Sequence, residues 1–171
     1  MKEVLISIKP KWCQLISSGE KTVEVRKTRP KVDKPFKAYI YCTANKGVND
    51  LLEIHGTDGK IRKANGKVIG EFVCDEIVAA ECGFYCSLNS TETLLDAFDL
   101  LDYADGKTVY GWHISDLVIY DKPKELSEFS RHDSSYDNAF GWAFEDRAKT
   151  VSITRPPQSW CYVESAEGDK E

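Results

Sequence analysis

Short segments in which apolar and polar residues alternate dominate this 171-residue chain. Such alternation is typical of β-strands with one buried face, because successive side chains of a strand point to opposite sides. Glycine, proline and other turn-forming residues separate these segments. The pattern predicts strands at residues 4–8, 22–26, 36–42, 67–82 and about 110–120. A chain built this way is expected to form a mainly β structure.

Two segments have helical spacing instead. Residues 10–18 begin at Pro10, which suits a first helical turn, and Gly19 suits a left-handed terminator. Residues 90–103 form the clearest predicted helix, with Ser90 as its cap. Its predicted buried stripe is Leu94, Leu95, Phe98 and Leu101. Short helices among many strands predict an α+β fold, a small mainly-β barrel with helical additions.

The last third of the chain is less regular. Residues 131–149 show no clear periodicity, and Pro156 and Pro157 break the strand that follows. We expect one domain over residues 1–163, since 171 residues are about one domain's worth, and a flexible tail at 164–171.

Composition narrows the class of protein. Hydrophobic residues make up 42% of the chain, and no stretch of about 18 apolar residues predicts a membrane span. The N-terminus lacks the long apolar run of a signal peptide. We therefore expect a cytoplasmic protein whose six scattered cysteines are reduced, mostly buried thiols. The histidines and cysteines show no metal-site spacing and no cofactor motif is present, so neither a metal nor a cofactor is predicted.

The charge is unevenly distributed along the sequence. Residues 1–70 hold 15 of the 23 basic residues and 7 of the 28 acidic ones, which leaves 8 basic and 21 acidic residues in the remainder. Either this asymmetry gives the folded protein a basic face suited to phosphates, or the two halves mix in space and the charges cancel.

The segment SSGEKTVEVRKTRP, residues 17–30, is the main candidate for a site. Alternation puts Thr22, Glu24 and Arg26 on one face of a strand, and Lys21 lies at the N-terminal end of that strand. Arg26 suits bidentate binding of phosphate or carboxylate, Glu24 can orient it, and Lys21 can transfer a proton. The alternative is a surface salt bridge that contributes under about 1 kcal/mol.

Further candidates come from elsewhere in the chain. Lys9 and Lys11 can meet phosphates at a helix N-terminus, and Glu71, after Gly70, can face a cleft or solvent. Tyr41, Trp112 and Trp160 are candidates for base stacking, although a core position is the commoner role for a residue such as Trp112.

Four segments in order resemble the ASCH domain of the PUA-like superfamily, in its bacterial or phage type. They are ISSGEKTVEVRKTRP, VIGEFVCDEI, YGWHISDLVIYDKPKEL and RPPQSWCYVE. The match covers about residues 3–129, and the fourth segment extends it to the C-terminal strand. The resemblance implies an α+β, PUA-like, mainly-β pseudo-barrel with short flanking helices and a cleft beside it.

The resemblance also implies functions. The superfamily is associated with RNA binding and modification, some small bacterial members hydrolyse an acetylated cytidine nucleoside, and others are ribonucleases. In the deacetylating relatives a threonine nucleophile occupies the position of Glu24, and Glu24 cannot replace a hydroxyl.

Three functional hypotheses follow. The first is a domain that binds RNA or a modified nucleoside through Lys9, Lys11, Lys21, Thr22, Glu24, Arg26, Tyr41, Trp112 and Trp160. The second is a hydrolase, either a nucleoside amidohydrolase or a ribonuclease, that uses Lys21, Glu24 and Glu71. The third is a protein-interaction domain that uses the acidic second half. The sequence predicts no oligomeric state.

Overall fold

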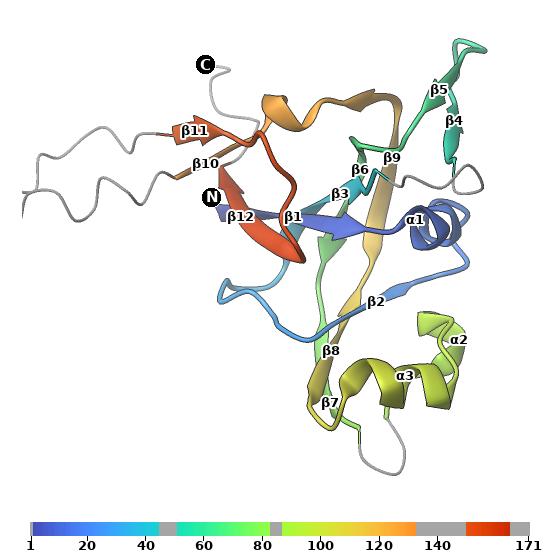
Figure 1. Ribbon diagram of the computed structural model, residues 1–171, viewed down its shortest axis with the longest axis vertical. Helices are drawn as coiled ribbons and strands as arrows, with labels where there is room; N and C mark the ends of the chain where they lie inside the picture. The colour runs from blue at the N-terminus through green and yellow to red at the C-terminus, as the bar shows by residue number, and fades with distance from the viewer. Residues whose placement is uncertain (1, 45–50, 83–86, 133–149, 165–171) are drawn as a thin grey trace, which may run out of the picture.

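A five-stranded sheet forms the centre of the molecule (Figure 1). The computed structural model describes residues 2–44, 51–82, 87–132 and 150–164. The strands of this sheet, in spatial order, are β12 (Trp160–Glu164), β1 (Lys2–Ile8), β3 (Phe36–Cys42), β6 (Lys67–Cys74) and β9 (Ser115–Lys124). β1 and β3 are parallel, and the other neighbouring pairs are antiparallel.

Smaller sheets complete the strand arrangement. β2 (Val23–Arg26), β8 (Thr108–His113) and β7 (Ile77–Glu81) form a three-stranded sheet, with β8 in the middle. Two further antiparallel pairs are β4 (Glu53–His55) with β5 (Ile61–Lys63) and β10 (Ser130–His132) with β11 (Thr150–Ser152). A short 3₁₀ helix, η1 (Leu126–Glu128), follows β9.

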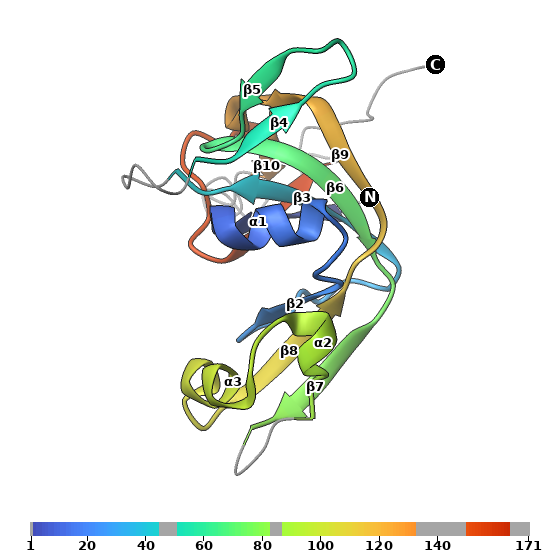
Figure 2. The same ribbon diagram turned by 90° about the vertical axis from the view of Figure 1, so that its right-hand side faces the viewer.

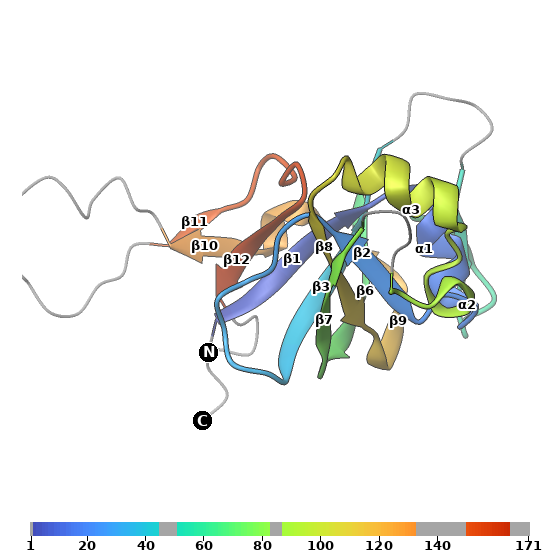
Figure 3. The same ribbon diagram turned by 90° about the horizontal axis from the view of Figure 1, so that it is seen from below.

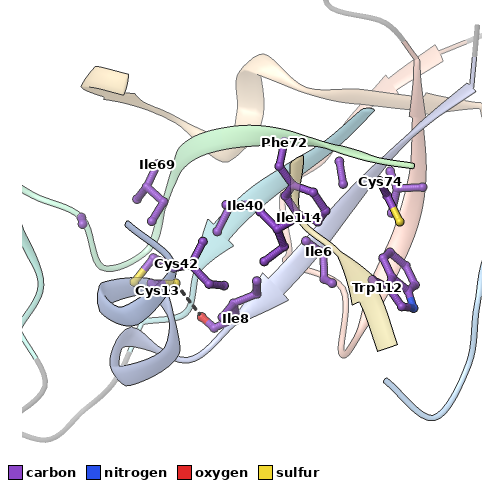
Figure 4. Packing of buried hydrophobic residues seen from close by; sticks show 14 of the residues in the cluster. Ile6, Ile8, Cys13, Ile40, Cys42, Ile69, Phe72, Cys74, Trp112 and Ile114 are labelled. Atoms are coloured by element: carbon purple, nitrogen blue, oxygen red, sulfur yellow. Dashed lines mark hydrogen bonds between the residues drawn. The ribbon is translucent and has the colours of Figure 1, made fainter. Parts of the chain in front are cut away.

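Alternation along the central strands produces two apolar layers. Ile6 and Ile8 of β1 share one layer with Ile40 of β3, and Trp112 closes this cluster at one side (Figure 4). Side chains of the opposite parity pack on the other face, against η1 and Ile153, the residue that follows β11. That second cluster consists of Leu5, Tyr39, Tyr41, Val68, Leu126, Phe129, Ile153 and Val163. The sheet is therefore covered on both sides.

Helix α1 (Pro10–Ser17) agrees with the predicted helix at residues 10–18. Pro10 is its first residue, and Gly19 adopts the predicted left-handed conformation, with φ of 77°. Cys13 and Ile16 point into the first cluster. The backbone N–H of Lys21 then donates to the Leu15 carbonyl, 2.9 Å away, and this bond turns the chain back toward β2.

The prediction of a single helix at residues 90–103 is wrong. The structure has α2 (Ser90–Thr93) and α3 (Ala97–Ala104), separated at Leu94, whose φ is 54°. Asn89, not Ser90, caps α2, and Asp96 caps α3. The break rotates α3, so Phe98 is 83% exposed instead of belonging to a buried stripe.

Two predicted strands are also divided. The strand predicted over residues 67–82 is β6 and β7, which belong to different sheets and meet at Asp75 and Glu76. The strand predicted at about 110–120 is β8 and β9, which separate at Ile114. The α+β, mainly-β fold with short flanking helices is confirmed, but the described sheets do not close into a barrel.

The thiol prediction holds only in part. Cys13, Cys42, Cys74 and Cys161 are free, and burial raises the pKa of the Cys74 thiol to about 12. Cys82 is disulfide-bonded, so the expectation of reduced thiols throughout is wrong. Most of residues 131–149, and nearly all of the tail predicted to be flexible, lie outside the described ranges. Within those ranges, no helix is long and apolar enough to cross a membrane.

Candidate functional site

A cleft of about 720 Å³ opens between α1 and α3. Figure 2 shows α1 above β2 and α3. Its lining combines cations, carboxylates, aromatic rings and prolines. The lining residues are Ser7, Lys9, Lys11, Trp12, Lys21, Glu24, Val25, Arg26, Thr43, Leu95, Asp99, Tyr103, Pro156, Pro157 and Gln158.

Three charged side chains from the predicted motif meet in the cleft wall. Glu24 Oε1 lies 3.0 Å from Arg26 Nη2, and Glu24 Oε2 lies 3.7 Å from Lys21 Nζ. The side chains of Glu24, Arg26 and Lys21 are only 7%, 13% and 2% exposed, respectively. Shared burial distinguishes this cluster, which we call the Lys–Glu–Arg trio, from a surface salt bridge.

Backbone carbonyls fix both cations of the trio. Lys21 Nζ donates to the Thr93 carbonyl at the end of α2, and Arg26 Nη2 donates to the Ser7 carbonyl of β1 at 2.7 Å. The trio therefore joins the two sheets and α2. Arg26 Nε is buried and has no hydrogen-bond partner among the described residues. One donor of the guanidinium is thus left unused beside the cleft.

The surroundings of the trio shift two pKa values. Burial lowers the pKa of Lys21, and nearby Arg26 adds to this effect, whereas the Glu24 carboxylate opposes it. The Lys21 amine therefore loses its proton at a lower pH than the amine of an exposed lysine. Burial raises the pKa of Tyr103, although the Arg26 guanidinium opposes that shift. The Tyr103 side chain thus remains a neutral phenol on the opposite wall.

Trp12 provides an aromatic surface next to the trio. Lys21 Nζ lies 4.9 Å from the centroid of its ring, and Lys11 Nζ lies 4.7 Å from it. Lys9 is the N-cap residue of α1, so its side chain enters the cleft where the helix dipole is positive. Cations and aromatic rings therefore share one wall.

Five of the predicted site residues line this cleft: Lys9, Lys11, Lys21, Glu24 and Arg26. Thr22 does not line it. Its backbone N–H donates to the Glu92 carbonyl at 3.1 Å, and its carbonyl accepts from Ile114 at 2.9 Å. Thr22 precedes β2, so the predicted alternation does not extend to it.

The other candidates also lie outside the cleft lining. Tyr41 packs in the second cluster, and Trp112 is fully buried against Phe36 and Trp160. Trp160 Nε1 donates to Thr28 Oγ1 at 2.9 Å.

The side chain of Glu71 contacts Lys37 and Tyr120. Glu71 Oε1 lies 3.2 Å from Lys37 Nζ, and the Tyr120 hydroxyl donates to its other carboxylate oxygen. Tyr39, its partner on β3, belongs to the second cluster. Glu71 is therefore engaged away from the cleft.

Sequence reasoning missed several lining residues, among them Thr43, Asp99, Tyr103 and Gln158. Asp99 and Tyr103 are four residues apart within α3, a spacing that puts both on one helix face. That signal was present in the sequence, because the helix predicted at residues 90–103 contains both positions. Thr43 and Gln158 lie in loops, where no periodicity marks them.

Comparison with known proteins identifies the fold. No family model and no curated protein matches the chain. Solved structures of ASCH from Zymomonas mobilis do match it, at 22% identity and a TM-score of 0.60, over 95% of this chain and 87% of that one. A mutant form of that protein matches at a TM-score of 0.61, with 98% and 94% of the two chains covered and the same 22% identity. The predicted ASCH-type fold is therefore confirmed: this chain has the fold of those structures.

Proposed function

We propose that the cleft binds one nucleotide of a single-stranded RNA, or a modified nucleoside. The observation that carries this proposal is the buried Lys–Glu–Arg trio, set in a concave wall with Trp12 opposite Tyr103. Fold similarity alone does not define a ligand, so the proposal rests on the chemistry of the cleft.

Each part of the cleft suits one part of a nucleotide. Lys9 and Lys11 are exposed cations positioned for a phosphate. Trp12 and Tyr103 offer aromatic faces for a base. Glu24 can accept hydrogen bonds from a base amino group or a sugar hydroxyl, while Arg26 supplies donors. A nucleotide can therefore satisfy charge, stacking and hydrogen bonding together.

Filter binding with labelled RNA hexamers of random sequence tests the proposal. Arg26→Ala should weaken binding about tenfold or more, because a hydrogen bond to a charged group contributes roughly 1.5–3 kcal/mol. Arg62→Ala, which removes a guanidinium from the β4–β5 hairpin, is the matched control and should bind like the unmodified protein.

Arg26 is buried, so thermal melting must show that the variant folds. Arg26→Lys provides a second variant that keeps the charge but loses the planar donor pair. Unchanged RNA binding in both folded variants would refute the proposal.

Hydrolysis is a second candidate, favoured by the lowered pKa of Lys21. A neutral Lys21 amine beside the cleft could accept a proton from a water molecule that attacks an acyl carbon or a phosphorus. Incubation with acetylated cytidine and with RNA, followed by chromatography, tests both activities. Turnover should be lost in Lys21→Ala, and the absence of product from both substrates would exclude them as substrates.

A further inference from the structure

A cationic segment leaves the cleft at the end of β2. Residues 27–31 contain Lys27, Arg29 and Lys31, whose side chains are exposed. Arg26, which lines the cleft, comes directly before them. We call residues 27–31 the exit segment.

The exit segment is attached to β12. Thr28 Oγ1 accepts from Trp160 Nε1 at 2.9 Å, and the Lys31 backbone N–H donates to the Tyr162 hydroxyl at 2.7 Å. Figure 3 shows the loop after β2 running between β12 and β8. Side chains in this segment are therefore presented from a backbone held in place on one side.

Two of its cations lie over aromatic rings. Lys27 Nζ is 5.2 Å from the ring centroid of Tyr103, a residue of the cleft lining. The Arg29 guanidinium carbon is 5.8 Å from the ring centroid of Tyr110, on β8. Pairs of cation and aromatic ring thus continue from Trp12, through the cleft, to Arg29.

A second hollow lies beyond Arg29. Arg29 and Lys31 line it together with Pro30, Val32, Asp33, Pro35 and Phe36. Asp33 also lines the hollow, and its carboxylate repels an anion locally. The apolar members provide a surface on which a base can rest, next to two cations that can meet its phosphate.

We infer that the exit segment is a track for single-stranded RNA, and that it holds the nucleotides adjoining the one in the cleft. This inference rests on the proposed function. A polymer of phosphates and flat bases matches a row that alternates cations with aromatic rings, whereas an acidic peptide would use only the cations. A guanidinium whose inner face lies on Tyr110 can also stack a base on its outer face.

Binding of ligands of two lengths tests the inference. We compare random-sequence RNA hexamers with an equimolar mixture of the four 5′-mononucleotides, by direct titration and by competition. The unmodified protein should bind hexamers at least about tenfold more tightly, since each stacked base adds roughly 1–3 kcal/mol. The double variant Lys27→Ala/Arg29→Ala should lose about tenfold toward hexamers and stay within about twofold for mononucleotides.

The matched control removes two exposed cations elsewhere. Lys60→Ala/Lys63→Ala acts on the β4–β5 hairpin, which lies apart from the loop after β2 (Figure 1). Arg29→Lys keeps the charge but not the planar face, and should lose part of the hexamer affinity.

The outcomes separate the inference from the function on which it rests. Equal affinity for mononucleotides and hexamers would overturn the track and leave the cleft proposal standing. Equal losses in the exit-segment variant and the hairpin control would also overturn it, because they would indicate unspecific charge attraction. If neither ligand binds, both the track and the proposed binding of an RNA nucleotide in the cleft fail.

Discussion

At the scale of single residues, Lys21 shows how burial and charge oppose each other. That its neighbours Glu24 and Arg26 share one face could be predicted from the sequence, because a strand puts residues two apart on the same side. The burial of the trio could not, since it depends on α2, whose Thr93 carbonyl accepts a hydrogen bond from Lys21. The sequence also left two roles open for Trp112, and tertiary packing put it in the core.

Lys21 should titrate below the ordinary lysine value of 10.5. Between its lowered folded pKa and 10.5, the unfolded chain binds more protons, so stability should rise with pH across that window. Glu24→Gln should lower the pKa of Lys21 further, because the carboxylate favours the ammonium form. Side-chain NMR of labelled lysines measures both, with Lys60 as the exposed reference. A Lys21 midpoint at or above 10.5 would contradict this account.

At the scale of elements, the helix α3, which forms one wall of the cleft, could be predicted only in part. Helical spacing in residues 90–103 correctly indicated helix, but the apolar pattern runs across Leu94 and hides the break. Asp96 was the available signal, because aspartate is a strong N-cap residue. Its side chain accepts from the Asp99 backbone N–H at 2.8 Å. Local capping therefore decided against one continuous helix.

The dipole of α3 predicts opposite effects for one chemical change at its two ends. Asp99 lies in the first turn, whereas Asp105 follows the last residue, with φ of 52°. Asp105→Asn should stabilise the protein by about 0.5 kcal/mol, because it removes a negative charge from the negative end and asparagine tolerates this φ. Asp99→Asn should destabilise it by a similar amount. Urea unfolding measures both, and shifts of the same sign would exclude the dipole as the cause.

At the scale of the whole molecule, the sequence predicted strands better than their distribution between sheets. The sequence predicts one long strand over residues 67–82, yet β6 pairs with β3 and β9 while β7 pairs with β8. Pairing between distant segments divides the strand, and no local propensity records it. The same distant pairing brings the two halves of the chain together at the cleft. Its cations come from the basic half, and Asp99 comes from the acidic half.

This charge arrangement predicts a definite salt dependence. Each phosphate neutralised on a single strand contributes about −0.7 to the slope of log affinity against log salt concentration. Contacts to about three phosphates, in the cleft and along the exit segment, therefore predict a loss of roughly 20-fold for hexamers between 50 and 200 mM salt. Mononucleotides should lose far less. Binding of a partner protein to the acidic second half would also weaken with salt, but it would not depend on the length of an RNA. Pull-downs at the same salt concentrations therefore separate protein binding from RNA binding. Hexamer affinity that stays constant over this range would rule out phosphate contacts as the basis of binding.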